Sequence, residues 1–451
     1  MIAPRTLKGF RDFLPDVMLP REQLINTATE VFRSYGFCPI DTPALEYLEI
    51  LQGKGSDETD KQLYHFTDHG GRHVGLRFDL TVPLARYTAQ HFAELTFPFK
   101  RYHIGKVWRG ENTQAGRYRE FTQCDFDAIG TKSLAADIEI ALVINDLLER
   151  IDLKTKKKFT RFKIRINNRK ILSGLLEKHG IADKTAPILR ALDKLGKIGK
   201  SAVLKEMTET ASLSANQAEA VLTLTDLAGA AQERGVSTPR CDETLSALRP
   251  LLAGTPVGEE GVAQLSEFMR SVKAAGIPED RIVLDVSIAR GLDYYTGTIY
   301  ETFLNDLPTI GSVCSGGRYD NLAGVYTKQE LPGVGSSLGL DRLMSAMEEL
   351  GMLEKTTVPV QVFLPFFAAD RLCDYLRFAA ELRRGGVGVE FYPEAKKLGQ
   401  QLKYADKRGF RWAIIIGEDE WISGNCQIKD LRTGESVECP MAECVHRTVH
   451  S

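Results

Sequence analysis

The sequence lacks the features that mark membrane-spanning, secreted and zinc-clustered proteins. No uninterrupted apolar run approaches membrane-spanning length, and the first residues, MIAPRTLKGFRDFLP, lack the apolar core of a signal peptide. The eight cysteines include no CxxC pair, and the eight histidines include no HExxH. We therefore expect no disulfide framework and no fixed protein metal site, and we expect a reducing cytosol and no membrane partner.

The chain also lacks an excess of charge of one sign, an internal repeat of fixed period and any low-complexity tract. A formal net charge of −2 gives no global attraction to nucleic acid or to an anionic membrane, so any nucleic-acid contact needs local basic surface. With 451 residues, 43% of them hydrophobic and 26% charged, the chain is long enough for two or three globular units with a sizeable core.

Periodicity along the chain predicts three kinds of region. Residues 21–35 carry apolar side chains at helical spacing, and residues 101–111 and 118–130 read as two antiparallel strands joined by a polar loop. From about 170 to 275 the composition turns to Ala, Leu, Lys and Glu, which is typical of a helical insertion. After the polar break EKTTVP, strands alternate with helices over residues 359–451, which indicates a small α/β domain.

Residues 107–127 concentrate arginines and acids on the two predicted strands and their loop. Alternate residues of a strand share a face, so Gln123, Asp125 and Asp127 point together. Arg109 can hold phosphate through a two-donor fork, and a nearby carboxylate can accept from a base amino group or bind a phosphate-held metal. A solvated sheet face with cross-strand ion pairs explains the same residues without a ligand.

Three further stretches bring charge close to tightly packed backbone. Asp79 could neutralise a ligand ammonium or cap a turn. RGLDYYTG, residues 290–297, could bind a polar ligand or form an ion pair packed under tyrosines. Paired glycines in residues 314–322 allow a ligand to approach the backbone, and Arg342 follows a small-residue strand at the start of a helix.

Two basic tracts favour a structural interpretation. Residues 154–170 are expected to form a solvated strand edge whose lysines prevent edge-to-edge pairing. The basic helix at 395–409 could contact RNA phosphates, but its charge alone assigns no site.

Taken in order, these segments resemble the class II aminoacyl-tRNA synthetases, and within them the histidyl-tRNA synthetase family. VFRSYGFCPIDTPALE is similar to the first class II motif, VWRGEN…GRYREFTQCDFD to the second and GVGSSLGLDRL to the third. RGLDYYTGTIYE and SGGRYDNL are similar to the two signatures peculiar to histidyl enzymes. The resemblance covers essentially the whole chain.

The resemblance implies an α+β fold: an antiparallel sheet with flanking helices, a helical insertion and a C-terminal α/β anticodon-binding domain. The catalytic domain would span residues 1–352, interrupted at about 170–275, and the anticodon-binding domain residues 359–451. The implied activity joins L-histidine to tRNA(His) through a histidyl-adenylate, with ATP and Mg²⁺. The implied assembly is a cytoplasmic homodimer with the first motif at its interface.

The resemblance also implies a role for individual residues. Arg109 and Arg290 would be the catalytic arginines at the α-phosphate of ATP. Asp79 and Asp127 stand where many bacterial members have glutamate. The implied ATP site is Arg109, Glu111 and Arg342; the implied histidine site is Asp79, Thr81, Gln123, Asp127, Arg290, Tyr294, Tyr295 and Tyr319; and Gln114 and Arg117 would meet the tRNA acceptor end.

An alternative of another class is the non-catalytic paralogue that serves as regulatory subunit of ATP phosphoribosyltransferase. That paralogue typically lacks the C-terminal domain and the catalytic arginine, whereas Arg290 and residues 359–451 are both present here. An RNA-binding or signalling module of the same fold is a second alternative, made less economical by the full set of phosphate-facing arginines.

Overall fold

The structure is a computed structural model in which the chain forms two compact units. The first unit comprises Met1–Arg11 and Leu24–Leu353, and the second comprises Asp12–Gln23 and Glu354–Ser451. No helix within the described residues is long and apolar enough to cross a membrane. The structure describes residues 1–52, 60–153, 162–229, 241–288, 294–353 and 357–444.

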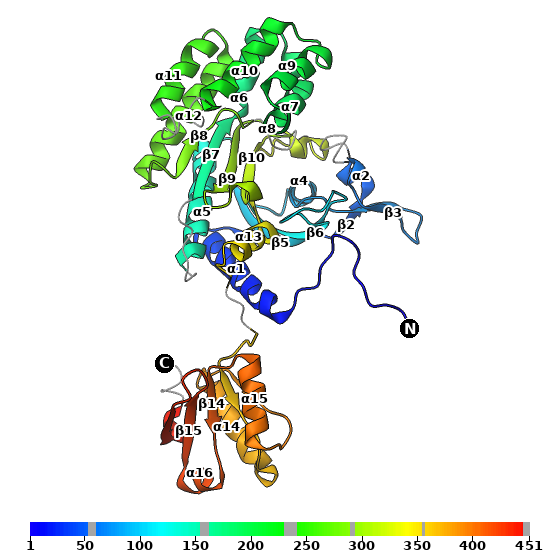
Figure 1. Ribbon diagram of the computed structural model, residues 1–451. Coiled ribbons are helices and arrows are strands. Elements are labelled where there is room, and N and C mark those ends of the chain that lie inside the picture. The colour runs from blue at the N-terminus through cyan, green and yellow to red at the C-terminus, as the bar shows by residue number, and fades with distance from the viewer. Residues whose placement is uncertain (53–59, 154–161, 230–240, 289–293, 354–356, 445–451) are drawn as a thin grey trace. The chain divides into compact units, whose positions relative to one another are not determined.

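An eight-stranded sheet organises the first unit (Figure 1). Its strands pair antiparallel except at the two edges, where the outermost strand runs parallel to its neighbour. The predicted pair of strands at 101–111 and 118–130 is confirmed as two long central strands, β5 and β6. In spatial order the strands are β1 (Cys38–Pro39), β5 (Phe99–Trp108), β6 (Glu120–Ile129), β11 (Gly333–Gly339), β10 (Cys314–Tyr319), β9 (Thr298–Leu304), β7 (Phe162–Asn168) and β8 (Ile282–Leu284).

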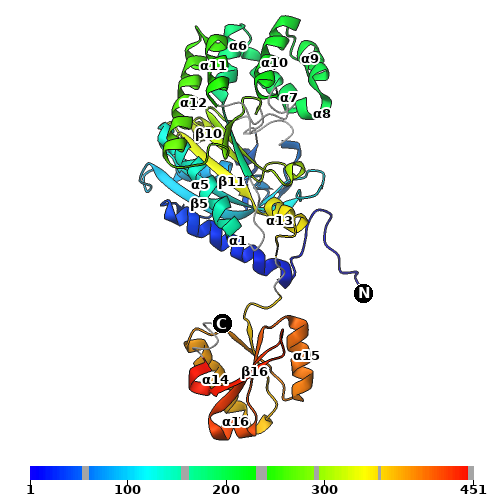
Figure 2. The same ribbon diagram turned by 60° about the vertical axis from the view of Figure 1, so that its left-hand side comes forward.

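Alternation along β5 and β6 gives the sheet one aromatic face and one charged face. Tyr102 pairs with Phe126 across the two strands, and the buried Phe32 ring lies 5.6 Å and 4.9 Å from theirs. Helices α1 (Pro15–Ser34) and α5 (Leu134–Leu153) cover this aromatic face (Figure 2). The opposite face, which carries Arg101, His103, Asp125 and Asp127, is therefore available for a polar site.

Smaller elements surround this sheet. A three-stranded sheet has the order β2 (Leu45–Tyr47), β4 (His73–Leu76), β3 (His65–Thr67). The neighbouring helices are α2 (Leu48–Leu51), α4 (Thr81–Gln90) and α13 (Leu340–Glu349).

The helical insertion follows β7 and gathers at one end of the large sheet (Figure 1). Its helices α6 and α12 pack on each other, with Gly258 backbone so close to Gly174 that a side chain at 174 would collide with it. The helices are α6 (Arg169–Lys178), α7 (Thr185–Asp193), α8 (Leu195–Ile198), α9 (Lys200–Glu209), α10 (Ala215–Gly229), α11 (Cys241–Leu252) and α12 (Pro256–Ala274).

The expectation of a solvated strand edge at residues 154–170 is wrong where the structure describes it. Strand β7 pairs on one side with β9 and on the other with β8, so it is an interior strand. Its apolar residues Phe162, Ile164 and Ile166 are buried. The lysine-rich start of the tract, residues 154–161, lies outside the described residues.

The second unit contains a mixed five-stranded sheet, as the strand–helix alternation predicts. Three strands run parallel, and two follow in antiparallel pairing. In spatial order they are β13 (Val389–Phe391), β12 (Val362–Leu364), β14 (Trp412–Ile415), β15 (Asn425–Asp430) and β16 (Ser436–Pro440), with helices α14 (Leu372–Arg384), α15 (Leu398–Arg408) and α16 (Glu418–Ser423).

Candidate active site

The candidate site lies on the charged face of the large sheet, where the strand register brings small and acidic residues together. Asp127 on β6 is directly opposite Arg101 on β5 and Gly335 on β11. The same row continues to Gly317 on β10 and Ile299 on β9. The absence of side chains at the two glycines lets the Asp127 carboxylate and the Tyr295 ring pack directly over the sheet.

Asp127 forms one end of this space. Its Oδ1 accepts a hydrogen bond from the Tyr319 hydroxyl at 2.5 Å, and its Oδ2 lies 2.7 Å from Nη2 of Arg101. A Cβ atom at position 335 would lie 2.0 Å from Asp127 Oδ1, so only glycine fits there. Burial raises the pKa of Asp127, while Arg101 and the Tyr319 hydroxyl oppose the rise.

Asp79 forms the other end. Its Oδ1 accepts from the backbone N–H of Val82 in the first turn of α4, and its Oδ2 accepts from the Tyr294 hydroxyl at 3.4 Å. The capping interpretation of Asp79 is therefore confirmed. Its carboxyl also lines the cavity, and its contact with a ligand ammonium stays a prediction. Burial raises the pKa of this carboxyl.

A cavity of about 350 Å³ lies between these two acids. Three tyrosines wall it, with the Tyr294 ring edge-on to those of Tyr295 and Tyr319 at 5.2 Å and 5.9 Å. All of the described residues predicted for histidine line this one cavity: Asp79, Thr81, Gln123, Asp127, Tyr294, Tyr295 and Tyr319.

A second cavity, of about 110 Å³, adjoins the first and shares Arg109, Arg117 and Gln123 with it. The residues predicted for ATP, Arg109, Glu111 and Arg342, all line it. The structure thus brings the two predicted ligand sets into neighbouring spaces, as a reaction between two bound molecules requires.

The arginines of the second cavity are held by their surroundings. Arg109 donates from Nε to the carbonyl of Phe78 at 3.1 Å, and its guanidinium lies over the Phe78 and Phe121 rings. Arg342, in the first turn of α13, donates to the carbonyl of Ser312 at 2.6 Å. Each guanidinium is thereby oriented before any ligand binds.

Three other predictions have different outcomes. Arg290 lies outside the described residues, so its predicted place at the α-phosphate stays a prediction. Arg117 lines both cavities and lies 3.7 Å from Glu111. Gln114 and Arg117 form a small backbone bridge at the tip of the loop between β5 and β6.

Residues outside the predicted set also line the cavity of about 350 Å³, which we call the amino-acid cavity after the ligand predicted for it. Among them are Asp125, Glu301, Ser315 and Ser337. Strand alternation already placed Asp125 on the face of Gln123 and Asp127. Glu301, Ser315 and Ser337 lie on β9, β10 and β11, and strand pairing brings them beside Asp125. Such pairing between distant segments cannot be read from a single sequence.

Comparison with known proteins assigns the family. A sequence model of the histidyl-tRNA synthetase family matches residues 9–343, and one of an anticodon binding domain matches residues 368–449. The chain belongs to the histidyl-tRNA synthetase family. It is 59% identical over 436 residues to the histidine–tRNA ligase of Rhodopirellula baltica, covering 97% of this chain and 95% of that protein. It is 44% identical to that of Treponema denticola, covering 99% and 98% of the two chains.

Solved structures agree with this family and with the predicted α+β fold. The crystal structure of histidyl-tRNA synthetase from Nostoc sp. PCC 7120 superposes with a TM-score of 0.87 at 35% identity, over the full length of both chains. An ATP phosphoribosyltransferase regulatory subunit/histidyl-tRNA synthetase from Bacillus halodurans has a TM-score of 0.71 at 22% identity, covering 89% of this chain and 96% of that one. The latter likeness shows the shared fold alone.

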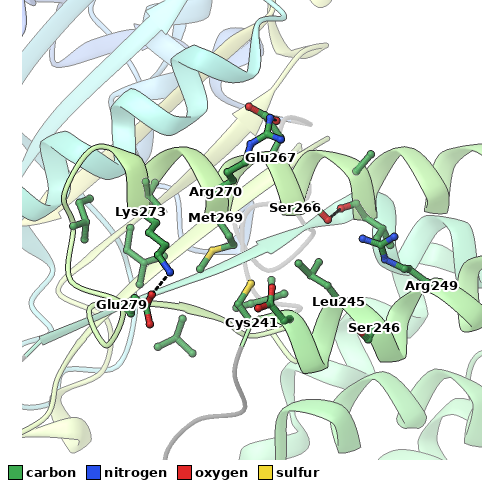
Figure 3. Close-up of a pocket in the computed structure, with 18 of the residues that line it drawn as sticks. Cys241, Leu245, Ser246, Arg249, Ser266, Glu267, Met269, Arg270, Lys273 and Glu279 are labelled. Carbon is green, nitrogen blue, oxygen red and sulfur yellow. Dashed lines mark hydrogen bonds and ion pairs between the residues drawn. The ribbon is translucent and has the colours of Figure 1, made fainter.

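A larger cavity, of about 1360 Å³, lies in the insertion of this histidyl-tRNA synthetase family member (Figure 3). Its lining comes from α11, α12 and β8 and contains none of the predicted site residues. Lys273 forms an ion pair with Glu279, and Arg270 with Glu267, so charged groups of the lining pair with each other. The candidate site is therefore the smaller space where polar groups converge, and not the cavity of greatest volume among these three.

Three cysteines in the second unit converge, although their spacing along the chain did not indicate it. The sulfur atoms of Cys426, Cys439 and Cys444 are buried and lie 2.9, 3.6 and 3.8 Å apart. Among the described residues they are the one group with the donors and spacing for a thiophilic cation. Contact with Cys444 and burial both raise the pKa of Cys426 and favour its thiol form.

Proposed function

We propose that this protein is a histidine–tRNA ligase. It activates L-histidine with ATP to histidyl-adenylate and pyrophosphate, and then transfers histidine to the 3′ end of tRNA(His). The observation that supports this proposal best is the pair of adjoining cavities, one lined by acids and tyrosines and the other by arginines.

The larger of the two cavities suits histidine. Asp79 would take the α-ammonium, with Thr81 and Gln123 beside it. The imidazole would lie between Asp127 and the tyrosines Tyr295 and Tyr319, where polar groups can pair with both ring nitrogens. A pocket of this kind rejects analogues that lack one nitrogen, because a buried polar group is then left unpaired.

The smaller cavity suits ATP. Arg109 would hold the α-phosphate, Glu111 the adenine amino group and Arg342 the γ-phosphate end. Mg²⁺ would be bound by the phosphate oxygens of ATP and would neutralise charge on the leaving pyrophosphate. This fits the donor set, because arginines dominate here and the described residues form no cluster of acids with metal-ligand spacing.

The reaction requires positioning more than proton transfer. The histidine carboxylate attacks the α-phosphorus in line with the departing pyrophosphate, and no side chain has to act as acid or base. The work of this chain is to align the two reactants and to stabilise charge on the phosphoryl oxygens. Arg109 is oriented for this role, and we assign Arg290 the same role.

Transfer to tRNA would involve both parts of the protein. Gln114 and Arg117, at the loop tip beside the cavities, would meet the acceptor end. Residues 359–451 would form the anticodon-binding domain, and the basic face of α15 offers contacts for RNA phosphates. We further propose catalytic-domain boundaries at residues 1–352, a cytoplasmic location and a homodimer with the first motif at its interface.

Histidine-dependent exchange of label between pyrophosphate and ATP tests the first half of the reaction. The wild-type protein should catalyse exchange with histidine and with none of the other amino acids. Charging of tRNA(His) tests the second half. If the protein catalyses exchange but does not charge tRNA(His), the result would support the adenylate step and contradict the transfer step.

The same exchange assay distinguishes a histidine–tRNA ligase from the alternative, a non-catalytic regulatory subunit. A non-catalytic subunit should give no exchange with histidine and should alter ATP phosphoribosyltransferase activity when mixed with that enzyme. Arg290, the complete C-terminal unit and the histidine–tRNA ligases similar at 59% and 44% identity support the ligase.

A further inference from the structure

Arg101 occupies an unusual position behind the amino-acid cavity. Its side chain is fully buried, and its Nη2 lies 2.7 Å from Oδ2 of Asp127 and 4.0 Å from Oδ2 of Asp125. The same nitrogen donates to the carbonyl of Leu80, between Asp79 and Thr81, at 3.3 Å. One guanidinium therefore touches the segments that carry both ends of the cavity.

Arg101 does not itself line the cavity. It forms an ion pair with Oδ2 of Asp127, an oxygen that has no hydrogen-bond partner among the described residues, while Oδ1 accepts from the Tyr319 hydroxyl. On a third side the carboxylate packs directly against Gly335, where a Cβ atom would overlap it. Arg101, Tyr319 and Gly335 therefore surround a carboxylate that also lines the cavity.

Stability alone does not account for this arginine. Nε and Nη1 of Arg101 are buried and have no hydrogen-bond partner among the described residues. A buried ion pair with unsatisfied donors is often no more stable than apolar side chains of the same volume. Its ion pair with Asp127, which lines the cavity, instead points to a role in the cavity.

We propose that Arg101 is a positioning residue for recognition of the imidazole: it orients the carboxylate of Asp127 and balances the charge that Asp125 and Asp127 share. The inference deepens the proposed function and rests on it. Asp125 is part of the same charged group as Arg101 and Asp127, because it lines the cavity and its Oδ1 has no hydrogen-bond partner among the described residues.

The charged and titratable groups around Asp127 come from several elements. Arg101 and His103 belong to β5, Asp125 to β6 and Tyr319 to β10, while Tyr295 and Asp79 face it from the 294–297 turn and the segment before α4. Burial raises the pKa of Asp125 to about 7, and Arg101 opposes this rise as it does for Asp127. Burial and the charges of Arg101 and Arg77 lower the pKa of His103 to about 3, so His103 is neutral at neutral pH while Arg101 is present.

The sign of the pH effect follows from these contacts. Removing Arg101 raises the pKa of both acids further, so they take up protons at a higher pH than in the wild type. A protonated Asp127 is a poorer acceptor for an imidazole N–H. Histidine binding should therefore weaken as pH falls, and in the variant the loss should begin at a higher pH.

The test compares Arg101→Met with wild type in pyrophosphate exchange between about pH 6 and pH 8.5, measuring KM for histidine and for ATP. We expect KM for histidine to rise roughly tenfold or more at neutral pH and its pH dependence to move upward. KM for ATP should stay within about twofold. Arg101→Lys keeps the charge without the planar fork, so its KM for histidine should lie between those of wild type and Arg101→Met.

Two controls separate positioning from structural damage. Arg165→Met removes a half-buried arginine of the same sheet, paired with Asp285 at 3.0 Å, and should leave the histidine pH profile unchanged. Asp127→Asn should remove most of the effect of Arg101→Met in a double variant, because Arg101 acts through Asp127. If Arg101→Met does not fold, Arg101→Lys carries the same pH series.

Unchanged KM for histidine at every pH would overturn the inference. So would an equal rise in KM for histidine and ATP without a shift of the pH profile. Wild-type protein that shows no histidine-dependent exchange would instead contradict the proposed function, and the two failures are therefore distinguishable.

Discussion

At the scale of single residues, the amino-acid cavity depends on close contacts that tolerate little change. Asp127 fits only because Gly335 has no side chain and because Tyr319 and Arg101 hold its two oxygens. Asp79 combines a helix cap with a face toward the cavity. The same side chains therefore both stabilise the local structure and line the cavity.

Gly335→Ala tests the close approach to Asp127. The added methyl group would meet Asp127 Oδ1 at 2.0 Å, so the carboxylate has to move. We expect KM for histidine to rise roughly tenfold or more in pyrophosphate exchange, with little change for ATP. Gly324→Ala is the matched control, because a Cβ there meets nothing within 4 Å. Equal kinetics for the two variants would contradict the proposed crowding.

Arg109→Ala tests the phosphate-binding role. Loss of one preorganised donor costs about 3–4 kcal/mol in the transition state, so the exchange rate should fall roughly 10²- to 10³-fold. Lys106→Ala, three residues earlier near the end of β5 but exposed and paired with Glu120, should stay within about twofold of wild type. Arg109→Ala with a near wild-type exchange rate would remove Arg109 from the chemistry.

At the scale of elements, the two faces of the large sheet divide the work. Aromatic residues on one face pack against α1 and α5, and the alternate residues on the other face form the site. Because the face that is buried fixes the register, the opposite face, which lines the two cavities, is held in register too.

Phe32→Ala tests the packing of the aromatic face against α1. Phe32 is fully buried against Tyr102 and Phe126, so its truncation should lower the free energy of unfolding by about 3–5 kcal/mol, measured by urea denaturation. Leu14→Ala is the control, since Leu14 is largely exposed and should change that free energy by less than about 0.5 kcal/mol. Similar values for both variants would contradict the packing role of Phe32.

Much of this architecture was predictable from local pattern. Alternation on β6 predicted that Gln123, Asp125 and Asp127 share a face, and helical spacing predicted the insertion. Arg101 was missed because its importance comes from strand pairing: it lies 26 positions from Asp127 in the chain yet directly opposite it in the sheet. The basic tract was misjudged for the same reason, since β8, about 120 residues later, covers the edge of β7.

At the scale of the whole molecule, the two units serve the two halves of the proposed reaction. The first unit carries both cavities, and the second matches an anticodon binding domain over residues 368–449. Under the proposed function, the adenylate step would use the first unit, whereas selection of tRNA would use both.

The proposed homodimer gives a prediction at this scale. Light scattering coupled to gel filtration should give a mass of about twice the 50.2 kDa of one chain at micromolar concentration. The two copies would be related by a two-fold axis through the segment of the first motif. A mass equal to one chain across the concentration range would contradict the dimer.

The most direct test of the central claim is pyrophosphate exchange by the wild-type protein with each amino acid in turn. The proposed function predicts exchange with histidine that depends on ATP and Mg²⁺, and none above background with the others. Absence of exchange with histidine, or equal exchange with another amino acid, would contradict it.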